Sequence, residues 1–89
     1  TKKEVIKMEK QLNNVIPLSE LPLGYKCKVN SLIAYGAIRR RLLDLGLING
    51  TEVMALEQSP SGDPIAYFIR GAVIALRSED ASQILVEKI

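Results

Sequence analysis

The stretch GAIRRRLLDLGLINGTEV, residues 36–53, changes from a helical to an extended pattern within a few residues. Its first half carries apolar side chains at Ile38, Leu42 and Leu45, which share one face of a short helix. Gly46 follows at the position where a helix often ends in the left-handed conformation. The stretch therefore predicts one short helix that ends at this glycine.

A tight turn comes directly after the helix. Asn49 and Gly50 both tolerate positive φ and together favour such a turn. The apolar runs that follow are short and separated by turn residues, which is typical of small strands. Gly62 belongs to a hairpin loop expected over residues 59–64. The downstream strands are expected over residues 51–58, 65–70, 72–77 and 84–89.

Two further positions interrupt the downstream strands. Gly71 marks a break, a bulge or a close approach of the backbone. Ser78 is predicted to cap the N-terminus of a single helical turn over residues 81–83, since Glu79 and Asp80 suit the positive end of a helix.

Upstream of the helix, a turn containing Gly24 precedes an alternating stretch. Its odd-numbered side chains are expected on one inward face: Tyr25, Cys27, Val29, Ser31 and Ile33. Cys27 is interpreted as a buried structural thiol, because no feature that activates a cysteine is evident nearby in the sequence. About five strands, one inserted helix and one helical turn before the last strand predict a mainly β fold, a small SH3-like β-barrel over residues 15–89.

The composition excludes several kinds of chemistry. The chain has 89 residues, a formal net charge of +2, one cysteine and no histidine, so His-based nucleophile pairs, His-containing zinc sites and four-cysteine clusters are absent. No phosphate-binding glycine motif occurs. The longest apolar runs, residues 65–69 and 72–76, are far shorter than the roughly 20 residues of a membrane-spanning helix. We expect a cytoplasmic binding module rather than an enzyme.

Residues 1–14 form a Lys-rich appendage without glycine or proline, expected to be helical or disordered. Val5, Met8 and Leu12 fall on one helical stripe. One interpretation is an amphipathic helix that docks on a partner or an anionic membrane surface. The other is a frayed tail or a strap over the domain's own core.

Three consecutive arginines, Arg39, Arg40 and Arg41, sweep about 200° of the helix circumference, so at least two are expected to face solvent. They are candidates for binding carboxylates or phosphates of a partner. Alternatively, one packs its stem on the barrel and pairs with a local acid such as Asp44. Asp63 is a further candidate for partner contact, although Gly-Asp-Pro is also a turn device.

Four segments resemble, in the same order, the FeoA family, ferrous iron transport protein A: residues 36–47, 49–53, 59–65 and 74–77. The likeness begins at Leu18 and continues to the end of the chain. The family usually has proline where this chain has Asn49 and a hydrophobic residue where it has Ser61. It usually has Glu-Ala at residues 80–81, where this chain has Asp-Ala. These changes suit the local turns and cap.

The resemblance implies a cytoplasmic accessory protein of bacterial ferrous iron uptake that acts on FeoB, a membrane transporter bearing a GTPase, and that meets the membrane only through this partner. It also implies transition metal ion binding at family level, but the spacing of the acidic residues is not that of an oxygen-ligand site, so neither a bound iron nor a cofactor is predicted. A bolder hypothesis is that one of the three arginines acts in trans on the GTPase as an arginine finger.

Other functions remain open at this point. Small barrels often bind nucleic acid through basic grooves with stacked aromatic side chains, but this chain has four aromatic residues and an acidic second half, so no nucleic acid is expected. A similar domain also forms the C-terminal part of some metal-dependent transcriptional repressors, where it makes intramolecular contacts. An exposed strand edge would allow a weak homo-oligomer.

Overall fold

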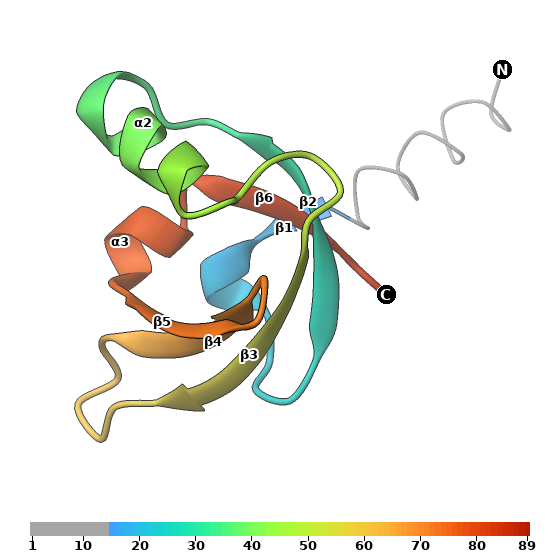
Figure 1. The fold of residues 1–89 in the computed structure, drawn as a ribbon. Helices are drawn as coiled ribbons and strands as arrows, with labels where there is room; N and C mark the ends of the chain where they lie inside the picture. The colour runs from blue at the N-terminus through green and yellow to red at the C-terminus, as the bar shows by residue number, and fades with distance from the viewer. Residues whose placement is uncertain (1–14) are drawn as a thin grey trace, which may run out of the picture.

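The computed structural model describes residues 15–89, and the predicted appendage over residues 1–14 lies outside the described residues. One antiparallel sheet has the strand order β1-β6-β2-β3-β4-β5 and curls around the core (Figure 1). Along the chain the elements are β1 (Val15–Pro17), the 3-10 helix η1 (Leu18–Glu20), β2 (Lys26–Leu32), α2 (Gly36–Asp44), β3 (Glu52–Gln58), β4 (Ile65–Ile69), β5 (Ala72–Leu76), α3 (Ser78–Ala81) and β6 (Ile84–Lys88).

The mainly β fold, the inserted helix and the helical turn before the last strand are confirmed. The sheet has six strands rather than about five, because β1 pairs with β6 through Val15↔Glu87. This strand has three residues and ends in Pro17, so it is too short to show an alternating pattern. The helical turn also starts earlier than expected, at Ser78.

The core is built from the inward faces of the strands together with η1 and α2. Tyr67 of β4 is fully buried, and its hydroxyl donates a hydrogen bond of 3.4 Å to the carbonyl of Leu18 in η1. Among residues 15–89 all buried side chains are apolar apart from this tyrosine hydroxyl and one thiol. Closure of the core therefore rests on burial of apolar surface, with η1 tied to the sheet by one hydrogen bond.

The inward face predicted over residues 25–33 is correct only at its centre, and Tyr25, just before β2, is 54% exposed. Cys27 and Val29 are buried, but Ser31 and Ile33 are exposed. The pairing of β2 with β6 shifts between Val29 and Ser31, and such a bulge moves the following side chains to the other face. Leu32 packs on the core in their place.

The hairpin of β4 and β5 turns through two residues. Ile69 pairs with Ala72, while Arg70 and Gly71 have φ values of 50° and 83°. Positive φ at both central residues is the mark of a type I′ turn, which matches the twist of paired strands. Of the three interpretations of Gly71, the break between strands is therefore correct, and β4 ends one residue before Arg70.

The C-terminus of α2 closes as predicted. Gly46 has φ of 93°, its N–H donates to the Leu43 carbonyl at 2.9 Å, and the N–H of Leu47 donates to the Leu42 carbonyl at 3.1 Å. These two bonds form a Schellman motif. The predicted turns at Gly24, Gly50 and Gly62 are also confirmed, each closed by a backbone hydrogen bond.

Replacing Gly46 by alanine is expected to lower the free energy of unfolding by about 1–2 kcal/mol, since its φ is unfavourable for an L residue. A Cβ there would also overlap Cδ of Arg70, whose stem lies across this glycine. Gly50→Ala is the matched control, because it has φ of 89° but open space around the added Cβ. Urea unfolding should show the larger loss for Gly46→Ala, and equal losses would contradict the packing of Arg70 on Gly46.

Candidate functional site

The three arginines of α2 have different surroundings. All are exposed, which confirms the prediction that at least two face solvent. One guanidinium nitrogen of Arg39 donates to the carbonyls of Leu32 and Ala34 at 3.3 and 3.4 Å. Arg41 pairs with Asp80 of α3, Nη2 to Oδ2, at 3.8 Å. Within residues 15–89, the side chain of Arg40 takes part in no hydrogen bond or ion pair, in contrast to those of its two neighbours.

Anchoring of α2 therefore uses two of its three arginines. Leu42 is the buried side chain of α2. Arg39 joins the first part of the helix to the end of β2 through the Leu32 carbonyl. Arg41 joins α2 to α3 through Asp80, which replaces the expected pairing with Asp44. Arg41 is the exposed partner of this pair, and at this length the pair contributes about 0–1 kcal/mol, so it adds little to the stability of α2.

Exposed apolar side chains lie on α2 and directly before and after it. Tyr35, at the N-cap of α2, is 86% exposed, and Leu43 and Ile48 are about half as exposed as Tyr35. Arg39, Leu43 and Ile48 line a shallow hollow of about 260 Å³ between α2 and β2. We call the set Tyr35, Arg39, Arg40, Leu43 and Ile48 the α2 surface.

Asp63 caps the start of α3 and does not belong to the α2 surface. Its Oδ1 accepts a hydrogen bond of 2.8 Å from the backbone N–H of Ser78. The prediction that Ser78 is the N-cap is wrong: Ser78 is the first residue of α3, and the N-cap residue, Arg77, makes no side-chain cap bond. The carboxylate from the β3–β4 loop supplies the acceptor because Ile65↔Leu76 pairing brings residue 63 opposite residue 78.

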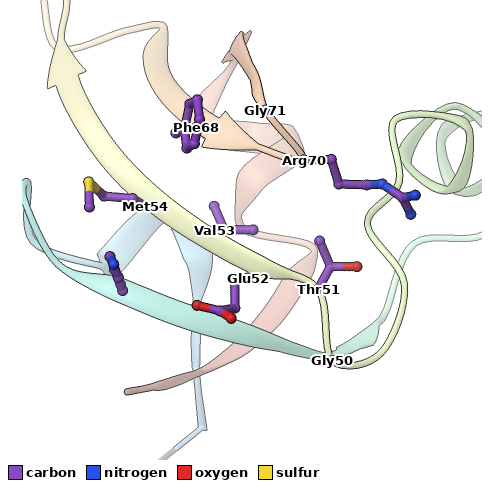
Figure 2. A pocket seen from close by; sticks show the side chains of 9 residues that line it. Gly50, Thr51, Glu52, Val53, Met54, Phe68, Arg70 and Gly71 are labelled. Atoms are coloured by element: carbon purple, nitrogen blue, oxygen red, sulfur yellow. The ribbon is translucent and has the colours of Figure 1, made fainter.

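A larger hollow, about 500 Å³, lies on the outer face of β2, β3 and β4 (Figure 2). Met54 pairs with Lys26 on one side and with Phe68 on the other, so these three side chains form a row across the strands. Arg70 and Gly71 complete one end. No pattern described above predicts this hollow, and the signal for it in the sequence is Met54 and Phe68 at outward positions of their strands.

The lining of the hollow combines the apolar Met54 and Phe68 with the cationic Lys26 and Arg70. Glu52 is the acidic residue of its lining. In the described part of the chain, no three Cys, Asp or Glu side chains gather as a candidate metal-ion site. No helix found over residues 15–89 is long and apolar enough to span a membrane.

Cys27 has the environment of a structural thiol. It is fully buried, and burial raises its pKa to about 11, offset in part by a hydrogen bond with the backbone of Val53. Burial likewise raises the pKa of Tyr67 to about 12. Neither group supplies a nucleophile near neutral pH, because both remain protonated.

Residues 16–88 match the family model described as the FeoA domain. The chain is 35% identical over 72 residues to the Fe(2+) transport protein A/Fe(2+) transporter FeoB fusion protein of Porphyromonas gingivalis; the match covers 81% of this chain and 8% of the fusion protein. The chain thus spans a small part of the length of that relative.

Two solved structures share the fold. The FeoA protein of Chlorobium tepidum is 39% identical with a TM-score of 0.78, over 83% of this chain and 70% of that one. FeoA of Stenotrophomonas maltophilia, described as an SH3 domain protein complexed with zinc, is 35% identical with a TM-score of 0.71, over 79% of this chain and 87% of that one. The SH3-like class and the resemblance found in the sequence are confirmed.

Asp63→Ala is expected to lower the free energy of unfolding by about 1 kcal/mol, the usual cost of a lost helix cap. Asp63→Asn should retain most of the stability, because an amide oxygen also accepts the Ser78 N–H. Ser78→Ala should cost much less than Asp63→Ala, since its own side chain does not cap α3. Thermal unfolding of the three variants checks this, and a larger loss for Ser78→Ala would restore the cap predicted from sequence.

Cys27 is expected to react with a disulfide reagent at pH 8 more than about 100-fold slower in the folded than in the urea-unfolded chain, because little thiolate is present. It is the chain's one cysteine, so the signal is unambiguous. Burial raises the pKa of Cys27 to about 11, so the folded state favours the neutral thiol. The stability that this thiol contributes is fully present below pH 9 and is lost as pH rises toward 11. Rapid labelling of the folded chain would contradict the assignment.

Proposed function

The chain belongs to the FeoA family, and from that membership we propose that it is an accessory protein of ferrous iron transport that binds the cytosolic GTPase-bearing region of a FeoB transporter. The fusion of the two proteins in P. gingivalis supports the partner, because a fused pair shares one location and one stoichiometry. In this proposal the protein is cytoplasmic and meets the membrane through the transporter alone.

The observation that carries the interface is the α2 surface. Its helix is held by Leu42, by the contacts of Arg39 and by the Arg41–Asp80 pair, whereas Arg40 is left without a partner among residues 15–89. A side chain held on an ordered helix loses less freedom on binding than one on a mobile loop. The α2 surface is therefore preorganised for contact.

The chemistry of the α2 surface favours an acidic patch with apolar side chains between its carboxylates. Guanidinium groups bind carboxylates in bidentate geometry, and arginine and tyrosine are enriched among residues that dominate binding energy. Tyr35, at 86% exposed, is the largest apolar group that such a contact would cover. Asp63 has no part in this proposal, because its carboxylate caps α3.

The arrangement of the aromatic residues supports a protein partner over nucleic acid. Tyr67 is buried, Tyr25 lies beneath the ammonium of Lys88, Tyr35 precedes α2, and Phe68 lines the outer hollow. Stacking of successive bases needs aromatic rings along one groove. The three exposed rings lie on different elements: Tyr25 before β2, Tyr35 at the N-cap of α2 and Phe68 on β4.

Arg40→Glu is expected to weaken binding to the soluble GTPase region of the cognate FeoB by at least about tenfold, or 1.4 kcal/mol. Lys26→Glu is the matched control: it makes the same charge change at an exposed cation that lines the outer hollow and lies away from α2. Its affinity should stay close to that of the unchanged chain. Titration calorimetry with each variant, after circular dichroism confirms folding, measures both effects.

The opposite pattern, loss with Lys26→Glu alone, would move the interface to the hollow, and no binding by the unchanged chain would refute the proposed function. GTP hydrolysis measured in the same mixtures tests the arginine-finger hypothesis. Single Ala substitutions at Arg39, Arg40 and Arg41 that leave stimulation unchanged would eliminate it.

A further inference from the structure

The two end strands of the sheet differ in how their free edges are protected. β1 is three residues long and includes Pro17, which has no N–H to offer. β5, Ala72–Leu76, is five residues long, contains neither charge nor proline, and pairs with β4 without a bulge. Short length, proline, charge and bulges are the devices that keep an edge from pairing, and β5 has none of the last three.

The turn at residues 70–71 determines which groups of β5 point away from the sheet. A two-residue turn makes Ile69↔Ala72 a hydrogen-bonded pair, and alternation then directs the N–H and C=O of Val73 and Ala75 away from β4. Beyond the sheet ladder, neither residue makes a backbone hydrogen bond within the described chain. Both are exposed, Val73 at 66%.

We propose that β5 is a dimerisation edge on which a second copy of the chain adds its own β5 in antiparallel orientation, with the two-fold axis through Ile74. In this register Val73 of one copy faces Ala75 of the other, and each such pair exchanges both backbone hydrogen bonds. A two-fold axis at Val73 or at Ala75 would instead set one outward-pointing residue against its own copy. The register centred on Ile74 is thus the one that joins both residues of each edge.

The side chains are complementary in the same register. On the outer face Val73 lies beside the small Ala75 of the other copy. Phe68, the neighbour of Val73 on β4, extends the same apolar surface. On the inner face the two Ile74 side chains meet. No charge in β5 is desolvated, and a net charge of +2 per chain gives weak repulsion.

A second copy suits this edge better than an unrelated strand, because symmetry guarantees it the same length, the same unpaired groups and the same apolar character. The proposal goes beyond the proposed function and does not depend on it, since no residue of the α2 surface belongs to β5. Its failure would leave transporter binding untouched, and the reverse also holds.

Sedimentation of the full chain across a dilution series is expected to show the mass rising from 9.8 kDa toward twice that value. Val73→Lys and Ala75→Pro should each raise the dimer dissociation constant at least about tenfold. Ala75→Pro removes an N–H that the β4 ladder does not use, so the fold should persist. Ile48→Lys, the same added charge at an exposed apolar residue of the α2 surface, is the matched control and should dimerise normally.

Oxidative cross-linking tests the register. Ile74→Cys, on the two-fold axis, should form an intermolecular disulfide readily, whereas Val73→Cys should do so poorly because it faces Ala75 of the other copy. Cys27 is buried and does not interfere. A chain that stays monomeric up to about 1 mM, or a dimer that persists in both edge variants, would overturn the proposal.

Discussion

The two-residue turn at Arg70 and Gly71 sets the register of β4 against β5, and several distant contacts depend on that register. Ile65↔Leu76 pairing brings Asp63 opposite Ser78, whose N–H its carboxylate accepts. The capped N-terminus starts α3, and α3 carries the carboxylate that pairs with Arg41 of α2. A shift of one residue would turn every side chain of β5 to the other face and would separate the cap from its donor.

Contacts at its two ends place α2 on the barrel. A helix of nine residues is marginal by itself, and this one has a single buried side chain within its bounds, Leu42. Its position is set at the ends: Arg39 binds carbonyls near the end of β2, and Gly46 closes the C-terminus. What remains exposed is a set of cationic and apolar side chains on a helix that is fixed at both ends.

Local chemistry in the sequence was enough to predict the features that depend on one or two neighbours. The Gly46 cap and the turn at Gly50 follow from positive φ, and the helix follows from its apolar spacing. The bulge after Val29 and the capping of Ser78 by Asp63 depend on strands that are far apart in sequence. For the site, exposure of the arginines was predictable from their adjacency, but Asp80 as the partner of Arg41 was not, because only the fold brings α2 and α3 together.

The two proposed contacts, through the α2 surface and through the β5 edge, depend on different physical interactions. Binding through exposed guanidinium groups gains from Coulomb attraction, which salt screens within a Debye length of about 8 Å at physiological ionic strength. Pairing at β5 uses backbone hydrogen bonds and burial of Val73, to which that screening barely applies. A small domain with one core has few ways to bind two partners without competition. Under the two proposals, side-chain charge at one site and main-chain pairing at another would keep the two contacts independent in both position and response to salt.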